Sequence, residues 1–265
     1  MATNITQIRR LQDHLTSLGL MLGSMSHGVK GMMTALDGGV YQLETGIRKW
    51  DPERIQKSFE RISDTSERIR KMVLDILYYA KSRGMQYQDT DAEQLANSLA
   101  ESGKALAAKQ GVTFYAEIAP DMGTFEVDPE WLHQAMLNFL ENAVDACTMD
   151  SDKPAHRIDF RTGVCEGDTL FFEVVDNGIG MDEEARRKMF TLFFSSKGSK
   201  GTGLGMFIAN HIISQHGGAI EVDSTYGEGT RTVVRVPRHR TEAARAADAL
   251  LNPPTGAGTD PGGLY

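Results

Sequence analysis

The sequence has little cysteine and no long apolar run, and both shortages narrow the class of protein. Its two cysteines, Cys147 and Cys165, are too few and too far apart for a disulfide framework or a zinc site. No apolar stretch approaches the roughly 18 residues that a membrane-spanning helix needs. The first ten residues hold no apolar core followed by a small-residue cleavage site. We therefore expect a cytoplasmic protein without a signal peptide or a membrane segment.

Positive charge is also in short supply. The 28 Lys and Arg residues are outnumbered by 36 Asp and Glu residues, which gives a formal net charge of −8. An acidic surface repels nucleic-acid phosphates and anionic lipid head groups, so direct nucleic-acid binding is disfavoured. The sequence also lacks the G-x-x-x-x-G-K-[ST] run, which excludes a P-loop. What remains is a chain of 265 residues, long enough to bury a sizeable core.

Two long amphipathic segments occupy the first third of the chain. Apolar residues recur with 3-4 spacing over residues 8–43 and again over residues 55–80, which predicts two long helices. Between them, Asp51 suits a helix N-cap and Pro52 suits the first turn of the next helix, so we predict a helical hairpin. One hairpin cannot cover both of its own apolar seams. We therefore predict a homodimer in which two hairpins form a four-helix bundle.

The first of these helices is rich in glycine, which costs about 0.5–1 kcal/mol per residue relative to alanine inside a helix. Either the backbone is closely approached there, or the helix is meant to bend; simple tolerance of glycine is the alternative. The glycines in question are Gly19, Gly23, Gly28, Gly31, Gly38 and Gly39.

Beyond residue 84 the pattern changes to mixed helices and β-type runs, which predicts an α+β two-layer sandwich. We expect helices over about 92–110, from the cap at Asp128 to about 147, and over about 204–216, with strands near 112–118, 156–164, 169–175, 219–224 and 230–237. The last segment is rich in Ala, Pro and Gly and cannot build a core, so we expect it to be disordered. The predicted domains are therefore 1–84 (hairpin), 85–237 (sandwich) and 238–265 (tail).

Four short motifs in this second part stand in an order that is hard to obtain by chance, although each is weak alone. They are NFLENAVDA at 138–146, DNGIG at 176–180, GTGLG at 201–205 and GEGT at 227–230. Amide oxygens such as those of a helical asparagine suit Mg²⁺ beside phosphates. An aspartate at a strand end can accept from an exocyclic amine, and N–H groups at a glycine-rich helix start can hold phosphate. Together the motifs predict a nucleotide site.

With these motifs, residues from about 92 to 237 closely resemble the ATP-binding domain of bacterial sensor histidine kinases. That domain shares a superfamily with gyrase, the ninety-kilodalton heat-shock chaperone and the mismatch-repair ATPase. The run MFTLFFSSK at 189–197 looks like the family's phenylalanine motif before a mobile lid. The nucleotide-binding residues that the resemblance implies are Asn138, Asn142, Asp176, Gly178, Gly180, Lys197, Gly201, Gly203, Leu204, Gly205 and Thr230.

The resemblance also implies individual roles. Asn142 would chelate Mg²⁺, and Asp176 would hold the adenine amine of ATP. Residues 201–205 would contact the phosphates together with Lys197, and Thr230 would lie near the base.

Two positions within this motif set bear on the reaction. The superfamily's hydrolysing members place a glutamate one turn before the magnesium-binding asparagine, as the base for water; here that position is Asn138, which cannot take a proton. We therefore expect ATP to be held for transfer to another nucleophile rather than hydrolysed quickly. Asp145 stands where some members carry a basic residue, so that phosphate contact is not expected here.

The hairpin resembles, less strongly, the family's dimerisation and phosphotransfer hairpin. The run MSHGVK at 25–30 is similar to the family's acceptor motif. His27 lies away from the apolar seam of the helix, which agrees with the exposure that a phosphoacceptor needs. The resemblance implies that His27 is the phosphoacceptor; an ordinary surface histidine is the alternative. His14 has no such motif around it and is interpreted as a surface residue.

Three residues depart from the acceptor motif. Gly28 replaces the usual acid, Gly31 replaces the Thr or Asn associated with dephosphorylating the partner, and Met32 replaces a helix-kinking proline. Our hypothesis is that Gly28 and Gly31 supply bend and close approach, and that deprotonation uses another acid or the ATP phosphate. Phosphatase activity is not expected.

The sequence thus predicts an ATP-dependent protein-histidine kinase that phosphorylates itself on His27 and passes the phosphoryl group to an aspartate of a response-regulator receiver domain. Its signal would come through a cytoplasmic partner or an upstream sensor segment. One alternative is a dimeric ATP-binding module without autokinase activity, favoured by Gly28. A serine/threonine kinase of the anti-sigma type is the other, and the long hairpin argues against it.

Overall fold

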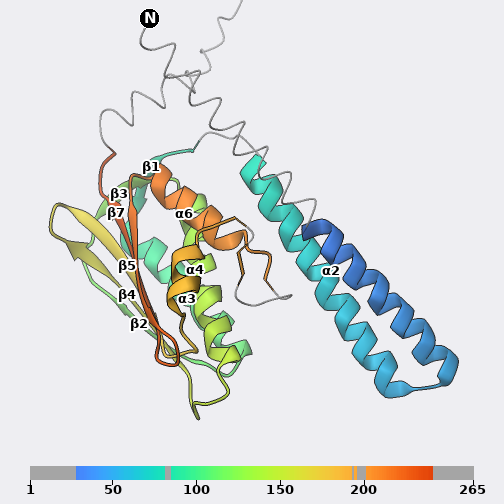
Figure 1. Ribbon diagram of the computed structural model, residues 1–265. Helices are drawn as coiled ribbons and strands as arrows, with labels where there is room; N and C mark the ends of the chain where they lie inside the picture. Colours follow the sequence, from blue (N-terminus) through green and yellow to red (C-terminus); the bar gives the residue numbers. More distant parts are fainter. Residues whose placement is uncertain (1–27, 81–84, 193, 196–200, 241–265) are drawn as a thin grey trace, which may run out of the picture. The chain divides into compact units, whose positions relative to one another are not determined.

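The computed structural model describes residues 28–80, 85–192, 194–195 and 201–240 (Figure 1). His27 and Lys197 lie outside the described residues, as does most of the predicted tail. The chain forms two compact units, one of residues 1–81 with 187–208 and one of residues 82–186 with 209–265.

The first unit contains the predicted hairpin. Its first helix covers residues 28–49 and is followed by α2 (Pro52–Ala80). The Asp51 carboxylate accepts a hydrogen bond from the backbone N–H of Arg54 at 3.0 Å, as expected of an N-cap. Trp50 takes a left-handed conformation (φ 52°) that ends the first helix, and its N–H reaches the carbonyl of Ile47 at 3.2 Å. From residue 28 onward, the hairpin and its capping signal are therefore confirmed.

Small residues let the two helices of the hairpin come close together. Met32, Gly39 and Gly46 are buried at every seventh position of the first helix. A Cβ added to Gly39 would lie 2.9 Å from Cγ1 of Ile62, and one added to Gly46 would lie 3.1 Å from Cγ1 of Ile55. Both distances are shorter than ordinary carbon contacts, so α2 occupies the space that a side chain would need. Close approach is the reason for glycine at position 39.

Gly31 and Gly38 differ from Gly39. A Cβ on either would meet no described atom outside its own turn within 4 Å. The hypothesis of close backbone approach at Gly31 therefore finds no support among the described residues. The same role for Gly28 stays a prediction.

The second unit is built on a five-stranded sheet with helices on one face (Figure 1). The strand order is β2-β4-β5-β7-β6, with β2 parallel to β4 and the remaining pairs antiparallel. The strands are β2 (Thr113–Ile118), β4 (Arg157–Cys165), β5 (Thr169–Asp176), β6 (Ala219–Thr225) and β7 (Gly229–Pro237). This is the predicted α+β two-layer sandwich.

The helices of this unit begin and end close to their predicted residues. They are α3 (Ala92–Lys109), α4 (Pro129–Met149) and α6 (Gly205–Gln215), of which α6 begins in the first unit. The Asp128 carboxylate accepts from the N–H of Trp131, and Pro129 occupies the first turn. The core between helices and sheet is apolar; its largest fully buried side chains include Phe125, Phe160, Phe172, Leu132, Met136, Leu140, Ile158 and Leu170.

Three short elements were not expected. Strands β1 (Gln88–Asp91) and β3 (Thr124–Val127) form a separate antiparallel pair, and α5 (Glu183–Lys188) follows the DNGIG motif. The ordered chain also extends past the predicted boundary at residue 237. Arg238 explains this extension, because its Nε donates to Asp168 at 2.6 Å and its carbonyl accepts from the N–H of Glu126.

The sheet face away from α3 and α4 carries a row of alternating charges across all five strands. The carboxylate of Glu173 on β5 is paired with Arg161 on β4 at 3.1 Å and with Arg231 on β7 at 2.7 Å. The row continues on both sides: Arg161 also pairs with Glu117 on β2 at 3.4 Å, and Arg231 also pairs with Asp223 on β6 at 3.6 Å. Glu173 is only 8% exposed, so its two ion pairs are partly shielded from water.

No described helix combines the length and the apolar character that crossing a membrane requires.

Candidate functional site

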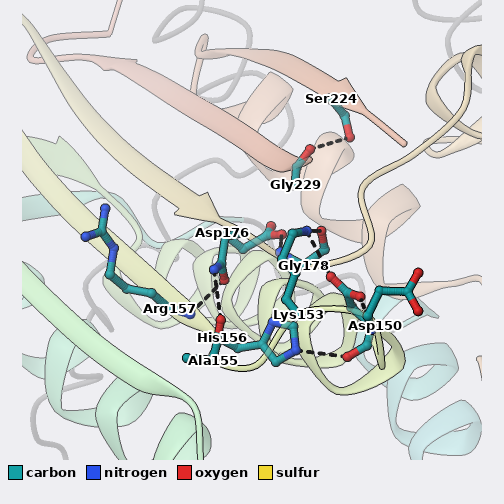
Figure 2. Close-up of polar contacts among 11 residues, drawn as sticks. Asp150, Lys153, Ala155, His156, Arg157, Asp176, Gly178, Ser224 and Gly229 are labelled. Atoms are coloured by element: carbon teal, nitrogen blue, oxygen red, sulfur yellow. Dashed lines mark hydrogen bonds and ion pairs between the residues drawn. The ribbon is translucent and has the colours of Figure 1, made fainter. Parts of the chain in front are cut away.

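The site centres on Asp176, the last residue of β5. Its side chain is 7% exposed, and Oδ1 accepts from the N–H of Gly178 at 2.9 Å (Figure 2). Burial raises the pKa of Asp176 to about 6, while backbone N–H groups of Gly178 and Thr230 and the charges of Lys153 and His156 oppose that shift. A buried carboxylate with so few fixed donors is suited to accept a donor from a ligand.

The loop after Asp176 packs directly on the last turns of α4. A Cβ on Gly178 would overlap the backbone of Ala146 and would lie 2.6 Å from the nitrogen of Cys147. The N–H of Ile179 donates to the carbonyl of Ala146 at 3.0 Å. Only glycine fits at position 178, and the helix that carries the two asparagines is thereby joined to the loop that carries Asp176.

On its other side the same loop packs on the turn between β6 and β7. Gly180 has a left-handed φ of 65°, and a Cβ there would overlap the carbonyl of Thr225. Gly229 has φ 130°, and a Cβ there would overlap the carbonyl of Asp176. Strand register places Thr230 opposite Asp176. The DNGIG and GEGT motifs are therefore brought together.

A serine that the sequence analysis missed links these two motifs. The Ser224 hydroxyl donates to the carbonyl of Gly229 at 3.0 Å (Figure 2). The same hydroxyl accepts from the N–H of Met181 at 2.8 Å. Thr230 Oγ1 lies 2.9 Å from Ser224 Oγ. Because the single Ser224 proton goes to Gly229, the Thr230 hydroxyl donates to Ser224. Thr230 is thus held in place beside Asp176.

The two asparagines lie one turn apart on α4. Asn138 is 5% exposed, and Asn142 is half-buried. Asp145, in the following turn, is exposed. Among the described residues, no group of three or more His, Cys, Asp or Glu side chains is placed to hold a metal ion. A divalent cation at this site would therefore depend on a neutral amide oxygen, on ligand oxygens and on water.

Asn177, between the two key residues of the DNGIG motif, has a structural role. Its Oδ1 accepts from the N–H of Arg157 at 2.7 Å, and its Nδ2 donates to the carbonyl of Ala155 at 3.1 Å. Its own N–H donates to the carbonyl of Arg157 at 3.2 Å. The side chain therefore binds the segment that enters β4 to the end of β5.

Lys153 is a second site residue that the sequence analysis missed. Its Nζ donates to Asp150 Oδ2 and to the carbonyl oxygen of Gly178, each at 2.9 Å (Figure 2). His156 lies beside it, with Nε2 at 2.9 Å from the carbonyl of Asp150. Neither residue belongs to a short motif. The contact of Lys153 with Gly178 joins residues 25 positions apart, so no short-range pattern could indicate it.

The glycine-rich segment belongs to the first unit and is described by itself. Gly203 has a left-handed φ of 68°, which suits glycine, and α6 begins two residues later at Gly205. Leu204 is fully buried, and its carbonyl accepts from the N–H of Ile208 at 2.9 Å. Gly201 is half-buried and precedes the helix in irregular structure. The first N–H groups of α6 have no partner within the helix, which is the feature that suits an anion.

Part of the chain is similar to a known protein family. The profile of the family described as "Histidine kinase-, DNA gyrase B-, and HSP90-like ATPase" matches residues 127–240. The matched residues 127–240 are called the ATPase-type domain below. The ATPase-type domain contains both asparagines, the Asp176 loop, the glycine-rich segment and Thr230.

Curated relatives extend the likeness of the ATPase-type domain to the hairpin. The signal transduction histidine-protein kinase AtoS of Escherichia coli K12 is 28% identical over 88% of this chain and 37% of its own length. Sporulation kinase E of Bacillus subtilis 168 is 26% identical over 90% of this chain and 31% of its own length. The chain therefore spans about a third of the length of these two relatives.

Solved structures share the fold of the ATPase-type domain and the hairpin. Histidine kinase ThkA, in a complex with response regulator protein TrrA, aligns with a TM-score of 0.69 at 22% identity, over 86% of this chain and 64% of that one. Full-length ShkA, in a complex with AMPPNP, aligns with a TM-score of 0.58 at 23% identity, over 84% of this chain and 46% of that one.

Proposed function

We propose that this chain is the catalytic core of a two-component system, an ATP-dependent protein-histidine kinase. The observation that carries the proposal is the buried Asp176 carboxylate, held between α4 and the β6–β7 turn within an ATPase-type domain. The hairpin that precedes this domain supplies the second element that a kinase of this type needs. The curated relatives named above are themselves kinases by name.

Asp176 would recognise the adenine base of ATP. Its carboxylate accepts the exocyclic amine, while guanine presents a carbonyl oxygen there and is repelled. Gly178 and Gly180 let the Asp176 loop pack on α4 and on the β6–β7 turn, which holds the carboxylate in place. Thr230, fixed by Ser224, borders the same position.

The phosphates and their cation would be held elsewhere in the motif set. We assign the phosphates to the N–H groups of residues 201–205 and to Lys197, which lies outside the described residues. The Asn142 amide oxygen would ligate Mg²⁺, a cation that ordinarily takes one or two protein oxygens beside phosphates and water. When bound, Mg²⁺ supplies neutralisation of the charge on the β- and γ-phosphates.

Asn138 favours transfer over hydrolysis. An amide has no basic site for a water proton, and Asn138 is 5% exposed, so it cannot serve as the base of an ATPase. The γ-phosphoryl group would go to a ring nitrogen of His27. The bond from the γ-phosphorus to the bridging oxygen breaks, a phosphorus–nitrogen bond forms, ADP leaves, and the imidazole proton passes to an acid side chain or to a phosphate oxygen.

The hairpin supports the homodimer in the proposal. Val29, Met33, Val40 and Ile47 form one stripe of the first helix and are between 42% and 56% exposed. Their spacing is that of a heptad seam, and on α2 Phe59 is 60% exposed. The exposed apolar residues of both helices need a cover, and a second copy of the hairpin offers the same surface.

The second partner in the proposal is a response-regulator receiver domain, whose aspartate would take the phosphoryl group from His27. ThkA is seen in complex with such a regulator, and its fold includes the hairpin. A signal would reach the core from an upstream sensor.

The test is incubation of the purified protein with γ-labelled ATP and Mg²⁺. We expect label on the protein that is acid-labile and alkali-stable, the behaviour of phosphohistidine. His27→Ala is expected to abolish this label while ATP binding is kept, and Asn142→Ala is expected to abolish the label by removing the cation ligand. Label on His27→Ala would overturn the acceptor assignment, and acid-stable label would indicate a serine/threonine kinase.

A second candidate is a dimeric ATP-binding module without autokinase activity. The specific observation in its favour is Gly28, which stands at the start of the described helix where the family's motif has an acid. ATP binding without any label would support this candidate. Gain of label in Gly28→Glu would then identify the missing acid as the cause.

A further inference from the structure

The segment that follows α4 is tied to the Asp176 loop by a charged side chain. Lys153 Nζ spans from Asp150 Oδ2 to the carbonyl oxygen of Gly178, with both distances at 2.9 Å. Figure 2 shows the three residues converging beneath Asp176. The Lys153 side chain is 27% exposed and the Asp150 side chain 6%, so this contact is largely shielded from water.

Among the described residues, several neutral contacts and the charged contact of Lys153 hold the Asp176 loop. Gly178 and Ile179 pack on the backbone of Ala146, and Asn177 binds the segment before β4. These are neutral contacts, whose hydrogen bonds each contribute a modest stabilisation. The Lys153 ammonium bonds the Gly178 carbonyl directly, and hydrogen bonds to charged groups contribute about twice as much.

The position of Lys153 also gives it an electrostatic effect on Asp176. The groups that face Asp176 are Lys153 and His156 from the segment after α4, Cys147 from α4, and the Thr230 N–H from β7. The pKa of Cys147 is raised to about 12 by its burial, so that thiol is neutral. Lys153 is therefore the permanent positive charge in this set, and it favours the ionised form of the carboxylate.

We propose that Lys153 is a positioning residue for base recognition: by bonding both Asp150 and the Gly178 carbonyl, it fixes the Asp176 loop against the end of α4. The inference rests on the proposed nucleotide site. Lys153 does not touch the ligand; it acts on the residue that does. Its side chain accordingly sets both where the Asp176 carboxylate lies and how readily it stays ionised.

The test uses the full chain and Lys153→Met, which keeps the apolar stem and removes the ammonium. Two readouts are compared: the dissociation constant for ATP with Mg²⁺, from about pH 5 to about pH 9, and hydrogen exchange of residues 176–181 without nucleotide. The loss of one charged hydrogen bond predicts about a tenfold weaker ATP dissociation constant at neutral pH and faster exchange of the Gly178 and Ile179 amides. The weakening grows as the pH falls, because Asp176 then protonates more readily.

Two further variants separate positioning from a general structural effect. Lys153→Arg keeps the charge and the donors and is expected to restore most of the affinity and the pH profile. Lys109→Met removes an exposed lysine from the last turn of α3 and is expected to change neither readout. Unchanged exchange and unchanged ATP affinity in Lys153→Met would overturn the inference. If Lys153→Met exchanged faster while the wild-type chain bound no ATP, the positioning role would be upheld and the proposed nucleotide site overturned.

Discussion

Protonation of Asp176 should make the affinity for ATP depend on pH. Its pKa is raised to about 6 by burial, and an adenine amine needs the ionised carboxylate as acceptor. ATP affinity is therefore expected to rise as the pH rises through about 6, and to fall by up to about tenfold per pH unit below it. Calorimetric titration of ATP across this range measures the effect. Asp176→Asn is the reference, because subtracting its profile removes the titration of the ATP phosphates.

The same raised pKa affects stability with the opposite sign. The unfolded-state pKa is near 3.9, so between about pH 4 and about pH 6 the folded protein binds more protons than the unfolded one. The contribution of Asp176 to stability consequently falls as the pH rises through this range. A stability gain in Asp176→Asn above about pH 6, without nucleotide, would agree with this sign. An equal stability of both proteins there would contradict the burial cost.

At the scale of elements, the charge row over the sheet has one buried member. Glu173 serves two arginines from neighbouring strands, so Glu173→Gln leaves both without their shared partner, and we expect a loss of about 1–3 kcal/mol in unfolding free energy. Trp131 fluorescence during chemical denaturation reports it, in a Trp50→Phe background that leaves one tryptophan. Glu221→Gln is the matched control, because Glu221 is 58% exposed and pairs with Arg235 at the sheet edge. We expect a change near zero there, and equal effects at both positions would refute the special role of Glu173.

Elements with strong local signals were predictable, and elements that depend on distant partners were not. The helices that follow Asp51 and Asp128 were predictable because each begins with an N-cap residue followed by proline. Strands β1 and β3 are four residues each and exist by pairing with one another, which short-range patterns do not encode. For the same reason the Asp176 loop was found from its motif, while the roles of Lys153 and Ser224 required the folded chain.

At the scale of the whole molecule, the exposed stripe on the hairpin predicts the oligomeric state. We expect the wild-type chain to sediment as a dimer. Met33→Glu combined with Val40→Glu would bury carboxylates in the bundle, so the dimer dissociation constant should rise by more than about hundredfold. Tyr41→Glu introduces the same charge on the outward face, where Tyr41 is 71% exposed, and should leave the dimer intact. Sedimentation velocity distinguishes these cases, and a monomeric wild-type chain would refute the bundle.

The alternation of side chains along β5 gives this strand two separate tasks. Leu170, Phe172 and Val174 are buried on the face that ends in Asp176, while Glu173 points to the opposite face. Residues on one face of β5 can therefore be substituted without altering the contacts of the other face. A single-residue insertion or deletion at the start of β5 would shift every later residue to the other face, moving Asp176 to the charged face and Glu173 into the core. The strand is open to substitution but closed to any change in length.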